Sequence, residues 1–206
     1  MDAHTLNIVP VLSTPVSALD LERSLTLLIA AKDQGTFEHS NRVAEITAEW
    51  IQYMKSRHQW VDFDEQDLVL AARLHDVGKI AVLDQILNKA GPLTLEEREQ
   101  LNLHSEIGYE LVRDLKSAEK FALAIRHHHE RWDGGGYPLG LKREQIPFFA
   151  QVICIVDAFD AMTSDRCYQK ARSTLEAIVE LEQNAGRQFS PLLTESFVQF
   201  LHSRNT

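Results

Sequence analysis

The chain has 206 residues, of which 44% are hydrophobic and 25% charged, a composition that suits one globular domain and excludes disorder as its main state. Acidic residues number 30 against 21 Lys and Arg, so the surface repels long polyanions, and we exclude duplex DNA or bulk RNA as partners. Cys154 and Cys167 form neither a Cys-x-x-Cys pair nor a disulfide framework, which favours a reducing cytoplasm.

The first segment, residues 1–18, carries Pro10 and Pro15 and has no sustained hydrophobic period. This pattern predicts a tail or linker ahead of one domain that spans residues 19–206. No basic stretch followed by an apolar one begins the chain, and no later run reaches the about 20 apolar residues that span a bilayer. We therefore expect no membrane segment.

Helical patterns follow from residue 19 onward. Apolar residues recur at intervals of three and four, at Leu21, Leu25, Leu28 and Ile29 and then at Val43, Ile46, Trp50 and Met54. Further helix starts are indicated by capping boxes at Thr94–Glu97 and Ser173–Glu176 and by Pro147. Alternating strand patterns are absent from the sequence, which predicts an all-α bundle of about seven or eight helices with irregular segments at 78–92 and 133–147.

Histidines beside acidic residues are the first candidates for chemistry. His75 and Asp76 end an apolar helix, and such a pair taken alone fits a helix-end partner or a core histidine better than a metal site. The chain has nine histidines, however, and others lie on helical segments, at His39, at His104 and in the run 127–129. Together they make a metal site the stronger hypothesis.

Asp157 lies in a nearly continuous apolar run, AQVICIVDAFDAMTS, which predicts a helix buried on most faces. An unpaired carboxylate there costs on the order of several kcal/mol, and no Lys or Arg lies within a helical turn of it. A metal ion shared with histidines satisfies Asp157, and this donor set suits iron, manganese, zinc or nickel. For Asp160, one turn later, a cap or a loop partner explains the residue equally well.

Three segments carry a family resemblance. HDVGK, HHERWDGGGYP and VDAFDAMTSDRCY, in this order and with His104 between the first two, resemble the HD-GYP subgroup of the HD superfamily of metal-dependent phosphohydrolases. The resemblance implies an HD-type helical bundle that holds two divalent transition-metal ions, Fe or Mn ahead of Ni or Zn. The ligands it implies, with Asp76 bridging the ions, are His39, His75, Asp76, His104, His128, His129 and Asp157. It leaves His127 as a neutral or supporting helix residue.

The substrate implied by the resemblance is cyclic di-GMP, hydrolysed to pGpG in bacterial second-messenger signalling. Lys79 would then contact a phosphate oxygen, and the loop with Gly136, Tyr137 and Pro138 would bind the nucleotide, since an aromatic ring can stack on a base. Arg166 would hold a guanine edge or a phosphate. Around Arg166 the match is looser, because Cys167 replaces the usual Pro and Gln169 stands where Arg is frequent.

Gly35 is a second departure from the family pattern. Relatives thought to hold three ions have a Glu four residues before the first ligand histidine, so Gly35 predicts two ions and places further hydrolysis of pGpG to GMP in doubt.

Two alternatives to a cyclic di-GMP phosphodiesterase stay open. One is a phosphodiesterase for cyclic GMP-AMP or another nucleotide, and the other is a catalytically weak cyclic dinucleotide-binding module. The intact ligand set argues against the second. A homodimer, an upstream regulatory domain and a partner protein are all compatible with the chain, because the helix expected at residues 19–33 suits a coupling helix and a core helix equally.

Overall fold

A computed structural model describes residues 18–57, 63–115, 118–165 and 170–204. These residues form ten α-helices and two short 3-10 helices. They are α1 (Ala18–Lys32), α2 (Gln34–Ser56), α3 (Glu65–Leu74), η1 (Val77–Ala81), α4 (Asp84–Leu87), α5 (Leu95–Asn102), α6 (His104–Val112), α7 (Glu119–His127), η2 (Arg143–Gln145), α8 (Phe148–Thr163), α9 (Thr174–Gln183) and α10 (Pro191–Arg204).

The all-α prediction is confirmed. Strand-type pairing among the described residues is limited to one bridge between Ala185 and Phe189. The helices outnumber the seven or eight expected, because one-turn α4 and η1 form inside the segment expected to be irregular and Leu103 divides α5 from α6. The other segment expected to be irregular, 133–147, contains only the three residues of η2. The predicted tail falls almost wholly on residues 1–17, outside the described residues.

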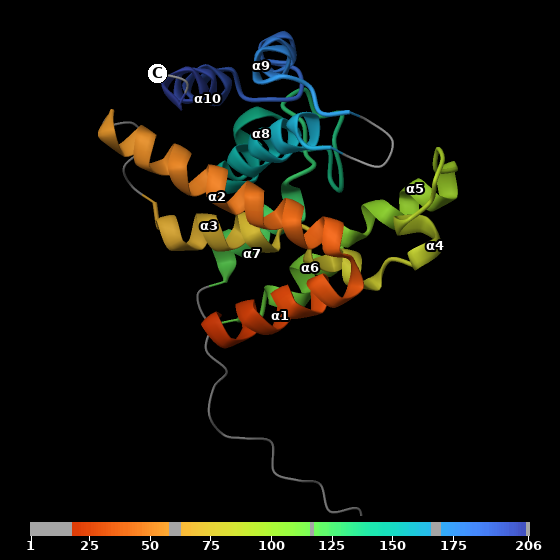
Figure 1. The fold of residues 1–206 in the computed structure, drawn as a ribbon. Coiled ribbons are helices and arrows are strands. Elements are labelled where there is room, and N and C mark those ends of the chain that lie inside the picture. Colours follow the sequence, from red (N-terminus) through yellow and green to blue (C-terminus); the bar gives the residue numbers. More distant parts are fainter. Residues whose placement is uncertain (1–17, 58–62, 116–117, 166–169, 205–206) are drawn as a thin grey trace, which may run out of the picture.

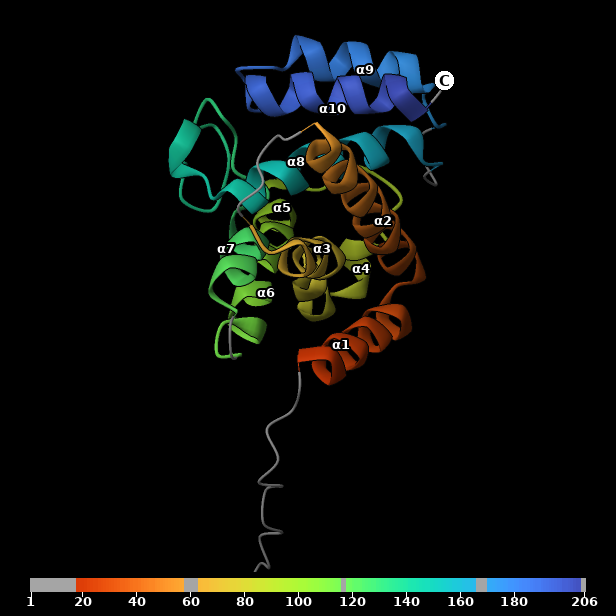
Figure 2. The same cartoon turned by 90° about the vertical axis from the view of Figure 1, so that its left-hand side faces the viewer.

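The layers of the bundle are visible in Figures 1 and 2. Helices α9 and α10 lie side by side across α8 at one end, and α1 lies at the other end, with α2, α3 and α7 between them. The core joins these layers through large side chains: Trp50 of α2 packs on Phe197 of α10 with ring centroids 4.7 Å apart, and its indole nitrogen donates to Ser196 Oγ at 3.2 Å. None of the helices in the described ranges has the length and apolar character needed to cross a bilayer.

Local sequence signals account for most helix starts. Thr94 and Glu97 form the expected capping box of α5, and Ser173 and Glu176 form that of α9. Pro147 directly precedes α8. Leu28 of α1 is 50% exposed, because this outer helix buries only a narrow stripe that includes Leu25 and Ile29.

Candidate metal centre

The seven predicted ligands meet in one place although they come from helices far apart in the chain. His39 lies near the start of α2, and Asp157 lies in α8. The other five lie where helices end or begin: His75 and Asp76 between α3 and η1, His104 at the first residue of α6, and His128 and His129 directly after α7. The bundle therefore collects donor groups mainly at helix ends, where the backbone changes direction.

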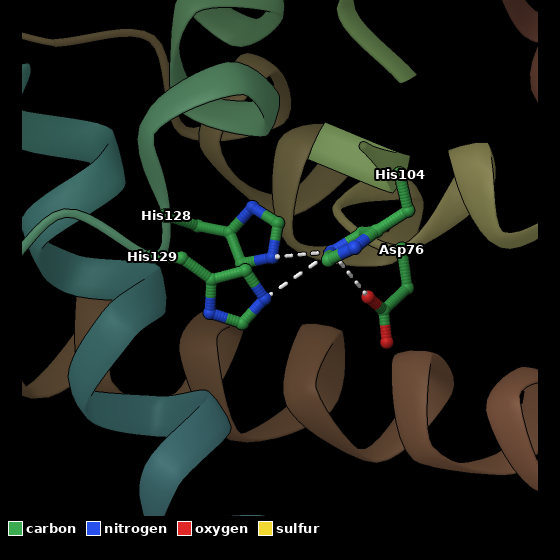
Figure 3. A group of neighbouring side chains, drawn as sticks. All are labelled: Asp76, His104, His128 and His129. Atoms are coloured by element: carbon green, nitrogen blue, oxygen red, sulfur yellow. Dashed lines mark hydrogen bonds and ion pairs between the residues drawn. The ribbon is translucent and has the colours of Figure 1, made fainter. Parts of the chain in front are cut away.

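The first group of donors consists of Asp76, His104, His128 and His129, shown in Figure 3. His104 is central, because its Nε2 lies 3.3 Å from Asp76 Oδ1, 3.4 Å from His128 Nε2 and 3.2 Å from His129 Nε2. All four side chains point toward a common region between α6 and the turn after α7.

The second group consists of His39, His75 and Asp76. His75 Nε2 lies 3.4 Å and His39 Nε2 lies 3.9 Å from Asp76 Oδ2. Asp157 Oδ1 approaches the same His39 nitrogen at 3.0 Å. Asp76 belongs to both groups, with one carboxylate oxygen directed to each, which is the arrangement needed to bridge two ions.

The protons of these imidazoles can be placed from their partners. The Nδ1 atoms of His75, His104 and His128 lie 2.7–2.8 Å from the carbonyl oxygens of Ala72, Leu101 and Ile125. A carbonyl only accepts, so each Nδ1 carries a proton, and Nε2 is then the bare nitrogen of the neutral ring. Those Nε2 atoms face one another and the Asp76 carboxylate, and that of His75 is buried with no hydrogen-bond partner among the described residues.

A cation satisfies such a convergence of lone pairs, whereas protein hydrogen bonds do not. Two N or O atoms that each lie about 2.1 Å from one ion are about 3.0 to 3.4 Å apart at octahedral and tetrahedral angles. The separations around His104, 3.2–3.4 Å, fall in this range. The first group of donors thus fits a divalent transition metal in both number and spacing.

The electrostatics agree with this fit. Burial lowers the pKa of His104 and His128 and brings that of His129 to about 3, so these rings stay neutral. Burial opposes ionisation of Asp76, but the charge of Lys79 outweighs it and holds the pKa of Asp76 well below the usual value. His39 lies among carboxylates, and although burial opposes its charging, Asp157 and Asp160 raise its pKa to about 9. The site therefore combines neutral imidazoles with the ionised carboxylate of Asp76.

Lys79 and the GGGYP loop lie at the edge of this centre. The Lys79 ammonium lies 2.5 Å from Asp76 Oδ2. Tyr137 packs its ring against His129 with centroids 4.8 Å apart, so stacking on a base is left to its opposite face. Gly136 permits this approach, because a Cβ there would lie 2.5 Å from the His129 carbonyl oxygen and 2.6 Å from the Cα of Glu130. Pro138 follows Tyr137 through a cis peptide bond.

Two buried carboxylates lie beside the centre but outside the predicted ligand set. Glu130 is 1% exposed and accepts hydrogen bonds from the backbone N–H groups of Leu139 at 2.7 Å and Leu141 at 3.0 Å, which ties the loop to the histidine run. Asp160 contacts His39 and Arg42 of α2 and also accepts from Ser164 Oγ directly after α8, so a partner beyond the helix end is only part of its environment. Its position three residues after Asp157 was the available signal, because such residues share a helix face.

The remaining expectations concern two residues. His127 is buried, with its Nδ1 3.6 Å from Glu130 Oε1, and therefore lies beside the loop contact instead of in either donor group. Arg166 lies outside the described residues.

Comparison with known families decides the classification. Residues 23–193 match the HD domain family. This chain belongs to the HD domain family. The result confirms the resemblance to the HD superfamily.

Relatives and solved structures extend the comparison. The HD domain is 36% identical over 180 residues to a cyclic di-GMP phosphodiesterase of Thermotoga maritima, covering 85% of this chain and 47% of that protein. It is 33% identical over 185 residues to 3'3'-cGAMP-specific phosphodiesterase 2 of Vibrio cholerae, covering 87% and 34%. A crystal structure of a V. cholerae cyclic GMP-AMP specific phosphodiesterase shares the fold with a TM-score of 0.61 at 21% identity, covering 90% and 49%. The chain therefore spans half or less of these relatives' lengths.

Proposed function

We propose that this HD domain is a metal-dependent phosphodiesterase that hydrolyses cyclic di-GMP to the linear dinucleotide pGpG. The observation that carries the proposal is the convergence of bare imidazole nitrogens on the two oxygens of Asp76. A relative 36% identical over 85% of the chain is named for that activity. The proposal locates the reaction in a bacterial cytoplasm, in keeping with the free thiol of Cys154.

The proposed ligands are the residues of the two donor groups together with Asp157, seven in all. Asp76 is shared between two ions. Bound divalent ions would lower the pKa of a water and neutralise the attacked phosphate, which is the chemistry that phosphodiester hydrolysis needs. His75, His104 and His128 are ready for this role without any change of tautomer, because their Nδ1 protons are already engaged by carbonyls.

The substrate contacts proposed here come from Lys79 and the GGGYP loop. The Lys79 ammonium beside Asp76 would donate to a phosphate oxygen on which negative charge develops. Gly136, Tyr137 and Pro138 would line the nucleotide site, with the half-buried Tyr137 ring offering its free face to a guanine. For Arg166 the proposal rests on the sequence alone, and its guanidinium would bind a base edge or a phosphate.

The proposed ions are two, Fe or Mn, with Ni or Zn compatible with the same donors. Gly35 supports the number, because it lies one turn before His39 and a Cβ there would meet only the Asp33 carboxylate within 4 Å. Elemental analysis of wild type and Gly35→Glu tests it. We expect two ions and slow conversion of pGpG to GMP for wild type, and three ions in wild type would contradict the assignment.

The decisive experiment is anaerobic turnover by protein reconstituted with Fe(II) or Mn(II), using cyclic di-GMP and 3'3'-cyclic GMP-AMP in parallel with separation of products. Asp76→Asn should remove turnover of both while the helical circular dichroism stays unchanged. Faster turnover of cyclic GMP-AMP would assign the substrate of the V. cholerae relative instead. Tight binding of nucleotide without turnover by metal-loaded protein would favour a sensor module and overturn the proposal.

A further inference from the structure

His39 is held differently from the three other imidazoles whose Nδ1 atoms have partners. His75, His104 and His128 each donate to the carbonyl three residues earlier, at a helix end. The last turn of a helix leaves carbonyl oxygens free, so these rings are oriented by their own local backbone. His39 lies inside α2, which continues to Ser56, and the carbonyls around it are engaged in the helical ladder.

The partner of His39 Nδ1 is the carboxylate of Asp160, at 2.7 Å and 121 residues away in the sequence. Both residues are buried, with 7% and 2% of their surfaces exposed. The carboxylate accepts further hydrogen bonds from Arg42 Nε at 2.7 Å, Arg42 NH2 at 3.0 Å and Ser164 Oγ at 3.1 Å. Four donors thus fix the plane of one side chain.

The opposite ring nitrogen of His39 faces the donor groups. Its Nε2 lies 3.0 Å from Asp157 Oδ1 and 3.9 Å from Asp76 Oδ2. Asp157 and Asp160 are one turn apart on α8 and lie on the same face of the helix. Each therefore contacts one of the two ring nitrogens of His39. A proton held on Nδ1 by Asp160 leaves Nε2 as the atom available to an ion.

We propose that Asp160, held in place by Arg42, is the positioning residue that sets the tautomer and orientation of His39 and thereby determines the affinity of one of the two ions. The inference rests on the proposed metal centre. The Asp160 carboxylate of α8 thus does for His39 of α2 what a backbone carbonyl does for His75, His104 and His128. The affected ion is the one that His39 and His75 share with Asp76, whereas at the other ion His104 and His128 are oriented by local carbonyls.

The test is stepwise binding of Mn(II) or Co(II) to metal-free protein, measured by competition with a chromophoric chelator for wild type, Asp160→Asn and Arg42→Gln. Removing a carboxylate that orients a ligating histidine typically lowers the affinity for the metal ion by about 10- to 100-fold. We expect that loss for one ion only, with the affinity of the other within about threefold of wild type. The Co(II) absorption bands should change for the same ion alone.

Ser164→Ala is the matched control, because it removes one hydrogen bond to the same carboxylate without touching His39. It should bind both ions as wild type does. Arg42→Gln keeps the test valid if Asp160→Asn fails to fold, since the Arg42 side chain is 41% exposed and its substitution leaves the core filled.

Two results overturn the role of Asp160. One is unchanged affinity for both ions together with a lower thermal midpoint of the metal-free variants, which assigns the contact to helix packing only. The other is an equal loss of affinity for both ions, which would indicate general damage to the fold. A wild type that binds no metal, or a His39→Ala variant with both affinities intact, would instead contradict the proposed metal centre itself.

Discussion

Lys79 places a positive charge directly against the carboxylate that the two donor groups share. Its ammonium lies 2.5 Å from Asp76 Oδ2, and its side chain is 23% exposed, so it is accessible from solvent and still within the centre. Lys89 makes a pair of the same length with Glu97 on the outlying α4–α5 segment. The two lysines therefore differ in place and not in the type of contact.

Lys79→Met is expected to lower kcat by about 10²- to 10³-fold, because it removes a donor to a phosphate oxygen on which charge develops. Metal content and thermal midpoint should change little. Lys89→Met provides the control and should retain wild-type kcat. An unchanged kcat in steady-state assays of Lys79→Met would refute the phosphate contact.

Cys154 is a buried thiol that has no role in the proposed reaction. It is 8% exposed, and its thiol donates to the Glu130 carbonyl oxygen at 3.8 Å. Burial raises the pKa of the thiol to about 12, so the thiol stays protonated at pH 8. In a Cys167→Ser background, Ellman's reagent should react with Cys154 only after denaturation. Complete reaction of the folded protein within minutes at pH 8 would contradict this expectation.

At the level of helices, η1 and α6 approach each other closely at Gly78. A Cβ at this position would overlap the carbonyl oxygen of His104 and lie 2.6 Å from the backbone nitrogen of Gly108. Both are backbone atoms, so relief requires the helices to separate. That separation would move His104 away from Asp76.

Gly78→Ala should therefore destabilise the fold by about 1 to 3 kcal/mol or more, the cost of overpacking, and also weaken metal binding. Thermal melts with and without Mn(II) measure both effects. Gly91→Ala is the matched control, because no atom lies within 4 Å of a Cβ at that position. If Gly78→Ala melts like wild type, the tight contact between η1 and α6 does not exist in solution.

Glu130 links the turn that carries His128 and His129 to the loop that carries Tyr137. Glu130→Gln replaces one acceptor oxygen by an amide N–H₂, which cannot accept from Leu139 or Leu141. Losing one charged hydrogen bond should raise KM for the cyclic dinucleotide about tenfold. The loss should be smaller on a small artificial phosphodiester that does not reach the loop. Glu144→Gln, at an exposed position of η2, serves as control, and an equal loss on both substrates would place the damage at the metals.

Considered as a whole, the molecule gathers the proposed ligands from α2, the junction of α3 with η1, α6, the end of α7, and α8. In Figure 2 these elements lie between α1 at one end and the α9–α10 pair at the other. Ions bound at the centre would connect most of the bundle. They would also bind the folded state alone, because the unfolded chain holds these donors far apart.

Metal removal should consequently lower thermal stability. An ion present at about 100 times its dissociation constant contributes about 2.7 kcal/mol, or about 5 to 10 °C for a domain of this size. Calorimetry of chelator-treated and Mn(II)-loaded protein tests this, and His39→Ala should show a smaller difference between the two states. Identical melting temperatures for apo and loaded wild type would mean that the donor groups bind no ion in the folded state.

Local and regional patterns determined much of this protein. Apolar periodicity and capping residues predicted an all-α fold, and the capping boxes at Thr94 and Ser173 are present where expected. These features depend on neighbours within one or two turns. The family resemblance implied the metal ligands, and helix ends that the sequence encodes carry His75, Asp76 and His104.

Tertiary structure decided how the ligands are held. The hydrogen bond of His39 to Asp160 spans 121 residues, and no property of either segment by itself selects that partner over a cap or a loop. The same holds for the narrow buried stripe of α1, where the outer position of the helix leaves Leu28 half exposed. Sequence patterns specify which side chains are polar and where helices begin. Partners on different helices are chosen only when packing excludes water and each buried donor or acceptor must find a neighbour.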